Sequence, residues 1–213
     1  MKQLLRYKKG LKLVFFDFET ESLTLNFDCG NRPWQLGMLK CQDKEEVEFK
    51  DLYVKWEKPI NVSKDAARIT GFDQKDYDKR ALPENEVFEV MLDWFNWADH
   101  IIAHNILNFD IPLAKEWYLK YNKDWKPLLP KCIDTKCLAQ AIKSGIPFDI
   151  QNDDFLTWQI ALSTYHERGV KTNLAQMAKD FDIDFDKSLL HNALEDIRLN
   201  KKVFESMIWN IEI

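Results

Sequence analysis

Apolar and aromatic residues form three strand-like runs in the first quarter of the chain. Residues 11–18 read LKLVFFDF, which is the pattern of a strand that is buried on at least one face. Residues 34–39 and 47–55 form two further candidate strands, separated by the charged stretch 43–46. Their order predicts an antiparallel meander.

Further along, helical spacing alternates with very short apolar runs. Ser63 can cap a short helix that stops at Gly71. A longer helix over 83–98 begins at Pro83, near a helix start where proline is tolerated. The elements that follow are a buried strand at 101–103, a helix over 111–121, a strand around 133 and a helix over 136–142. This alternation favours an α/β fold with parallel pairing in its second half.

The last third of the chain predicts mostly helix. Residues 144–171 are the hardest to interpret, and we expect them to form an elaboration that contains one helix, over 155–165. Two more helices are expected over 173–179 and 192–207. Because no internal repeat, linker or low-complexity tract is evident, we expect a single domain over 1–213.

The composition is that of a packed globular protein. Of the 213 residues, 46% are apolar and 31% are charged, which excludes disorder for most of the chain. No apolar run approaches the roughly 18 residues of a membrane span, and no signal-type apolar core follows the basic N-terminus, so we expect a cytoplasmic protein without a membrane partner. The cysteines lack the spacing of paired thiols, which fits a reducing compartment; they are Cys29, Cys41, Cys132 and Cys137.

The formal net charge of −5 bears on the class of ligand. Nucleic-acid affinity comes largely from phosphate neutralisation by Lys and Arg, so an acidic chain is an unusual candidate for that class. The acidic residues are not evenly spread, however. Asp17 and Glu19 end the first strand, and their side chains point to the same face because they lie two residues apart. Two such carboxylates repel unless a cation lies between them, although a strand that simply ends in a polar turn would show the same pattern.

Two later segments carry further acidic and histidine side chains. Asp110 follows His104 and Asn105 just after the short strand 101–103, where ligands gather in α/β sheets; ordinary turn residues before a helix are the alternative. Near the end of the chain, His191 precedes a helix whose first turn holds Asp196. A histidine there is suited to general-base work because its ordinary pKa lies near neutrality, whereas a lone histidine beside a helix is more often structural.

Read together, these segments resemble the DEDD superfamily of 3′ to 5′ exonucleases. The family motif Asp-x-Glu-Thr matches residues 17–20, and His-Asn followed by Phe-Asp matches residues 104–110. The third motif, His-x-Ala-x-x-Asp, matches residues 191–196. The histidine lies five residues before the aspartate, which indicates the histidine-bearing branch with DnaQ-like proofreading subunits, RNase T and oligoribonuclease. Residues 67–72 and 133–139 also look like family segments, so the similarity runs in order from about residue 11 to residue 203.

The resemblance implies a fold, a reaction and a set of site residues. The fold would be RNase H-like, a mixed five-stranded sheet flanked by helices. The activity would be a two-metal 3′ to 5′ exonuclease that releases nucleoside 5′-monophosphates from single-stranded DNA or RNA ends, and a polymerase or replication complex is a further candidate partner. Four carboxylates would hold two Mg²⁺ or Mn²⁺ ions and His191 would accept a proton from the attacking water; the carboxylates are Asp17, Glu19, Asp110 and Asp196. Family neighbours of these ligands contact the terminal nucleotide; here they are Phe18, Thr20, His104 and Asn105.

Three departures from the family leave other interpretations open. Three residues separate Asn105 from Phe109, where proofreading subunits often have two. The first motif continues with Glu21 rather than Thr-Gly, and the stretch 144–171 looks long for the family. A catalytically idle module that binds nucleic acid or a polymerase is the main alternative, and an RNase H-like endonuclease is another. Lysines and aromatic residues alternate over 115–131, which indicates either a single-strand binding surface or the solvated face of a helix.

Overall fold

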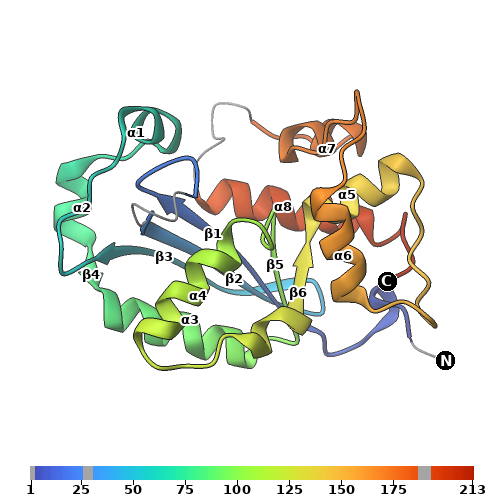
Figure 1. Ribbon diagram of the computed structural model, residues 1–213, viewed down its shortest axis with the longest axis horizontal. Helices are drawn as coiled ribbons and strands as arrows, with labels where there is room; N and C mark the ends of the chain where they lie inside the picture. Colours follow the sequence, from blue (N-terminus) through green and yellow to red (C-terminus); the bar gives the residue numbers. More distant parts are fainter. Residues whose placement is uncertain (1–2, 26–30, 187–192) are drawn as a thin grey trace.

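The computed structural model describes residues 3–25, 31–186 and 193–213. In this part of the chain, one mixed sheet holds six strands in the order β4-β3-β2-β1-β5-β6 (Figure 1). The meander is confirmed, since β1 pairs antiparallel with β2 and β2 with β3, whereas β5 and β6 run parallel to β1. The strands are β1 (Lys12–Thr20), β2 (Pro33–Gln42), β3 (Glu45–Lys55), β4 (Leu82–Pro83), β5 (His100–Ala103) and β6 (Cys132–Asp134).

The sixth strand corrects the expected five. β4 comprises two residues that pair in parallel with the end of β3, Leu82 lying opposite Val54. Two residues are too few to show a period-two pattern, and the sequence placed Pro83 in the helix that follows. Proline is compatible with an edge strand because its missing N–H can face away from the ladder.

Helices pack on both faces of the sheet and bury alternate residues of β1 (Figure 1). Val14, Phe16 and Phe18 contact the cluster formed with α3 and α4. Leu13 and Phe15 point to the other face, where α5, α7 and α8 supply the apolar partners. The main helices are α3 (Glu84–Trp97), α4 (Asp110–Lys120), α5 (Thr135–Ser144), α7 (Leu174–Asp180) and α8 (Ala193–Met207).

Capping residues set the ends of the short helices. Ser63 accepts a hydrogen bond from the backbone N–H of Ala66 and begins α1 (Lys64–Thr70), and Gly71 ends it with a φ of 70°. The short α2 (Gln74–Arg80) was not predicted, because it buries a single aromatic residue, Tyr77, and so shows no apolar stripe.

The elaboration 144–171 contains the expected helix, α6 (Phe155–Thr164), which covers the free edge of the sheet. Gln159 is fully buried there: its Oε1 accepts a hydrogen bond from the backbone N–H of Asp134 at 2.7 Å, and its Nε2 donates to the carbonyl of Cys132 at 3.0 Å. This side chain therefore satisfies backbone groups that an open edge strand would leave unpaired.

The structure can be compared with two sequence observations, the lack of a membrane span and the unpaired cysteines. Within the described ranges, no helix is both long and apolar enough to cross a membrane. The three cysteines in those ranges, Cys41, Cys132 and Cys137, are buried free thiols, as the sequence predicts. Cys29 lies outside the described residues.

Candidate active site

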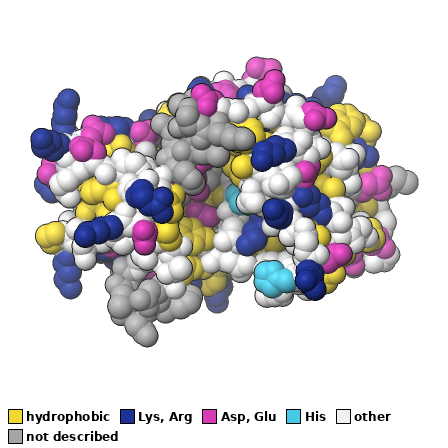
Figure 2. Space-filling view, turned by 90° about the horizontal axis from the view of Figure 1, so that it is seen from above, with side chains coloured by type: hydrophobic (Ala, Val, Ile, Leu, Met, Phe, Trp, Pro, Cys, Tyr) yellow, Lys and Arg dark blue, Asp and Glu magenta, His cyan; other side chains and the backbone are white. Residues whose placement is uncertain are grey.

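A cavity opens where the carboxyl ends of β1 and β5 meet the start of α8. Its volume is about 430 Å³, and Figure 2 shows acidic and histidine side chains inside the hollow at the centre of that face. The polar side chains of its wall are Asp17, Glu19, Thr20, Thr70, His104, Asn173, Asp196 and Asn200. The cavity thus brings together residues from all three motifs that the sequence singled out.

Asp17 and Glu19 lie on the sheet face that α8 covers, as their spacing predicts. Burial and, to a smaller extent, the charge of Asp196 together raise the pKa of Asp17 to about 7. Burial also raises the pKa of Glu19 to about 9, with added contributions from Asp17, Asp196 and Asp110. The four carboxylates are therefore close enough to oppose one another's ionisation, although they are contributed by three different elements.

Asp110 begins α4 and is almost completely enclosed, with 1% of its surface exposed. Burial raises its pKa well above the ordinary value, and the charges of Asp17 and Asp134 add to this effect, while backbone hydrogen bonds at Phe18 and at Asp110 itself oppose it. Its Oδ1 atom has no hydrogen-bond partner among the described residues. An enclosed carboxylate oxygen without a donor is costly, and a bound cation would satisfy it.

Asp196 reaches the site because α8 packs unusually close to β2. Gly37 lies opposite Asp17 in the β1–β2 ladder, and a Cβ atom at Gly37 would lie 2.6 Å from the Cδ1 atom of Ile197 and 3.0 Å from the Cβ atom of Ala193. A residue without a side chain is therefore needed beneath the first turn of α8. Sequence reasoning did not identify Gly37, because a glycine within a strand pattern gives no sign of which helix will cross it.

His104 is held by a chain of hydrogen bonds at the back of the cavity. Its Nδ1 atom lies 3.1 Å from the Oγ1 atom of Thr135, which donates to the Oδ1 atom of Asn200 at 2.8 Å. Burial and, to a smaller extent, the charge of Lys136 together lower the pKa of His104 to about 4, so the ring is neutral at pH 7. The hydroxyl proton of Thr135 is used by Asn200, so His104 donates through Nδ1 and its Nε2 atom is an acceptor. The contribution of Asn200 was missed, because one asparagine inside a helix carries no sequence signal.

Asn105 occupies the left-handed region with a φ of 72°, and Asp134 holds the loop in that conformation. The carboxylate of Asp134 accepts hydrogen bonds from the backbone N–H groups of Asn105 at 3.0 Å and Leu107 at 3.2 Å, and it also caps α5. The side chain of Asn105 accepts a hydrogen bond from Lys136. The sequence indicated Asp134 through family similarity alone, whereas the structure assigns it the position of the loop that leads to Asp110.

Phe18 and Thr20 border the cavity, but both side chains make contacts within the fold. The side chain of Phe18 is 3% exposed and contacts the rings of Phe16 and Trp117, with centroids 5.6 and 6.2 Å away. Its side chain therefore points to the opposite face of the sheet from the carboxylates of Asp17 and Glu19, so only its backbone lies beside them. The hydroxyl of Thr20 donates to the carbonyl of Ser22 at 2.6 Å and so stabilises the end of the strand.

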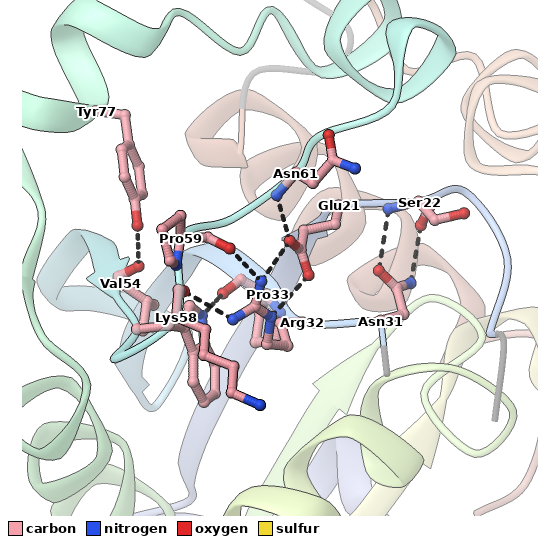
Figure 3. Close-up of polar contacts among 11 residues, drawn as sticks. Glu21, Ser22, Asn31, Arg32, Pro33, Val54, Lys58, Pro59, Asn61 and Tyr77 are labelled. Atoms are coloured by element: carbon pink, nitrogen blue, oxygen red, sulfur yellow. Dashed lines mark hydrogen bonds and ion pairs between the residues drawn. The ribbon is translucent and has the colours of Figure 1, made fainter. Parts of the chain in front are cut away.

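The departure at Glu21 forms an ion pair that ties three segments together (Figure 3). The guanidinium of Arg32 donates two hydrogen bonds to the Glu21 carboxylate, at 2.9 and 2.7 Å. It also donates to the carbonyls of Lys58 and Pro59, at 2.8 Å each. Since the backbone carbonyl of Glu21 accepts from the N–H of Ser63, the pair fixes the start of α1, whose last residue lines the cavity.

Two further parts of the sequence prediction, His191 and the stretch 115–131, are not among the described residues that line the cavity. His191 lies outside the described residues. The lysine and aromatic stretch 115–131 begins in the second half of α4, whose last residue, Lys120, lies about 15 Å from Asp110 by helix rise. There Lys120 pairs with the buried Glu84, and Trp117 is a core residue. The amphipathic-helix interpretation of this stretch is therefore the better one, because its lysine and tryptophan serve the fold.

The donor set suits a hard divalent cation. Within residues 3–25, 31–186 and 193–213, no group of three or more His, Cys, Asp or Glu side chains is placed so that it could hold a metal ion as it stands. The carboxylates nevertheless raise one another's pKa values, because Coulomb repulsion acts over longer distances than a coordination bond. Carboxylate oxygens, among them the unpartnered Oδ1 atom of Asp110, are ligands that hard divalent cations prefer.

Comparisons with known proteins agree with this geometry. The PolC-type DNA polymerase III of Mycoplasma pneumoniae is 24% identical over 205 residues, and that of Mycoplasma genitalium is 26% identical over 193 residues. These matches cover 96% and 90% of this chain but 12% and 11% of the polymerases, so the chain spans about a tenth of their length.

Solved structures give the same fold. Exonuclease I of E. coli in complex with a dA16 oligonucleotide matches with a TM-score of 0.71 and 15% identity, covering 94% of this chain and 41% of that one. Its zinc-bound complex with single-stranded DNA also has a TM-score of 0.71, with 16% identity over 92% and 40% of the two chains. The family model of RNase T type, described as Exonuclease, matches residues 14–204. With its acidic cavity, RNase H-like fold and this match over most of its length, the chain belongs to the exonuclease family.

Proposed function

We propose that this protein is a metal-dependent 3′ to 5′ exonuclease that acts on single-stranded DNA or RNA ends. The observation that carries the proposal is that Asp17 and Glu19 in the cavity lie close enough to Asp110 and Asp196 for the negative charges to raise their pKa values. A binding module has no need of such a cluster, because it destabilises the fold unless cations are bound. The cavity volume of about 430 Å³ is in the range of small-ligand sites and offers room for a terminal nucleotide.

Each carboxylate would serve as a metal ligand. Asp17, Glu19, Asp110 and Asp196 would hold two Mg²⁺ or Mn²⁺ ions, as the family resemblance implies. Such ions activate the attacking water and stabilise the charge on the leaving oxygen in an in-line displacement. The fit of these residues is supported by the oxygen-only donor set and by the unpartnered Oδ1 atom of Asp110.

The remaining steps belong to residues of the chain itself. The water oxygen would attack the terminal phosphorus while His191 accepts the proton. The bond from phosphorus to the 3′ oxygen breaks, which releases a nucleoside 5′-monophosphate and leaves a 3′-hydroxyl on the shortened strand. The neutral ring of His104 would accept a hydrogen bond from the terminal nucleotide through Nε2, and Asn105 and the backbone of Phe18 would lie beside it.

The substrate class and the partners are supported by the relatives. The exonuclease I structures hold dT13 and dA16 oligonucleotides, and the two sequence relatives are DNA polymerases by name. We therefore propose single strands with a free 3′ end as substrates and a polymerase as a candidate partner.

Degradation of end-labelled single strands tests the proposal. Purified protein is given 3′-labelled or 5′-labelled strands, DNA and RNA separately, with Mg²⁺, Mn²⁺ or a chelator. We expect stepwise loss from the 3′ end that is abolished by the chelator and by Asp196→Asn. Asp93→Asn, which neutralises a carboxylate whose side chain is 78% exposed, serves as the matched control and keeps full activity.

Two outcomes would overturn the proposal in different ways. Binding of both polymers without degradation under either metal would favour the idle binding module instead. Internal cleavage of a strand with blocked ends would favour an endonuclease. His191→Ala should lose most activity while it retains strand binding, and full activity in this variant would remove His191 from its role as the base.

A further inference from the structure

The segment that joins α6 to α7, residues 165–172, lies on the same side of the molecule as the cavity. Just before it, the carbonyl of Ser163 accepts a hydrogen bond from the side chain of Asn108 at 3.2 Å. The next residue after Asn108 is Phe109, which lines the cavity, and Asn173 at the other end of the segment lines it too. Both ends of the segment are therefore anchored at the mouth of the site.

The segment carries positive charge that the described part of the chain leaves uncompensated. The side chains of Arg168 and Lys171 are exposed and have no ion pair among the described residues. Other basic side chains near the cavity or on α4 do pair with carboxylates, as Arg32 does with Glu21 and Lys120 with Glu84. Figure 2 shows Lys and Arg side chains gathered beside the acidic hollow, on the side where α6 and α7 lie in Figure 1.

Aromatic and polar groups accompany these charges. Tyr165 is 42% exposed at the start of the segment, next to His166, and Glu167 is the one acidic residue of the eight. Exposed aromatic rings among basic side chains are the combination that holds single-stranded nucleic acid without sequence preference. An acidic cavity alone repels a polyanion, so cations are needed where the strand approaches the metal site.

We propose that residues 165–172 bind the sugar-phosphate backbone of the strand just upstream of the terminal nucleotide. Arg168 and Lys171 contact phosphates, and Tyr165 offers a ring on which a base stacks. The last part of the elaboration 144–171 thus contributes to strand binding, whereas α6 within it covers the edge of the sheet. The inference rests on the proposed function for the position of the 3′ end, but binding by the segment is measurable without catalysis.

The test compares two double variants that each remove two exposed positive charges. Arg168→Ala with Lys171→Ala removes the proposed contacts, and Lys8→Ala with Lys9→Ala removes two charges that lie before the start of β1, at the opposite end of that strand from Asp17. Both are made in the inactive Asp17→Asn background, and fluorescence anisotropy measures the affinity for a labelled single strand of about 12 nucleotides at several salt concentrations.

We expect the first pair to weaken binding about three- to tenfold and to reduce the salt slope by up to about 1.4, which is two lost phosphate contacts on a single strand. The Lys8 and Lys9 pair should leave both quantities unchanged. In active protein, the first pair should also reduce the preference for long strands over dinucleotides. Tyr165→Ala should weaken binding with little change in the salt slope, because stacking releases no counterions.

An unchanged salt slope in the Arg168 and Lys171 pair would overturn the inference, as would an equal effect of the control pair. Equal weakening on dinucleotides and on long strands would also overturn it, since a dinucleotide offers at most one nucleotide upstream of the cavity, whereas a long strand offers the whole segment its backbone. Failure of the proposed function has a different signature: wild-type protein would degrade no strand, while the salt slopes would still separate the two pairs.

Discussion

Asp17→Asn should stabilise the metal-free protein at neutral and alkaline pH while it abolishes activity. The pKa of Asp17 is raised from 3.8 to about 7 by burial and by the charge of Asp196. Between these two values the folded protein keeps a proton that the unfolded chain has lost. Stability therefore falls as the pH rises from about 4 to about 7, and above that range the full cost of the ionised carboxylate is present.

The magnitude follows from the size of the shift. About three pKa units correspond to roughly 4 kcal/mol of unfolding free energy. The carboxylate opens to the cavity and is screened by solvent there, so about 2 kcal/mol is the expected gain for the asparagine variant at pH 8. For a chain of this length, that gain raises Tm by roughly 4–8 °C. Removal of the Asp17 charge also lowers the pKa of Glu19, because Asp17 is the largest charged contributor to its shift.

Urea unfolding with a chelator, at pH 5 and at pH 8, measures the effect. The difference between wild type and Asp17→Asn should be small at pH 5 and large at pH 8. Mg²⁺ should reduce it, because bound cations stabilise the wild-type carboxylate and not the asparagine. Asp93→Asn, at an exposed site, should show no such pH dependence. Equal stability of wild type and Asp17→Asn at pH 8 would refute the idea that these carboxylates oppose one another's ionisation.

Three other substitutions test how the site is supported. Gly37→Ala should lower kcat at least tenfold and destabilise the fold by about 1–3 kcal/mol. Adding Ile197→Val removes the clashing Cδ1 atom and should restore part of the activity and of the stability. If neither recovers, close helix packing is not the cause. Asp134→Ala should cost about 3 kcal/mol in urea unfolding, because it leaves backbone N–H groups without an acceptor, and a loss under 1 kcal/mol would contradict its role in holding the loop. Arg32→Met should destabilise the protein measurably in thermal unfolding, whereas the same change combined with Glu21→Gln should cost less, since no buried charge is then left unpaired.

The sequence predicted the fold well where a periodic pattern had room to appear. The nine-residue β1 and the fourteen-residue α3 each carry enough apolar positions to define a period. The two-residue β4 does not, and its existence depends on an edge of β3 being available to pair with it. Such an element is decided by tertiary contact rather than by its own residues, so no local pattern could have predicted it.

The sequence predicted the candidate metal ligands but not the residues that hold them in position. The sequence singled out Asp17, Glu19 and Asp110 because each lies in a short motif. The structure places Asp17, Glu19 and Asp196 on the wall of one cavity, and Asp110 close enough to raise the pKa of Glu19. Asn200 and Gly37 were missed because their importance depends on what faces them from another element. A motif records the groups that perform chemistry, whereas the groups that position them are distributed along the chain without a fixed spacing.

The supports explain how so unfavourable a cluster can persist in the fold. The three elements that carry the carboxylates are each held by contacts outside the cluster: α8 by its approach over Gly37, the loop before Asp110 by Asp134, and the end of β1 by the Glu21 pair. Because these contacts are independent of cations, the carboxylates stay close even when their charges repel. If the carboxylates hold divalent cations as proposed, binding them would relieve this repulsion. The cost of repulsion in the metal-free protein would then contribute to the metal affinity, which is why Asp17→Asn should gain stability and lose function together.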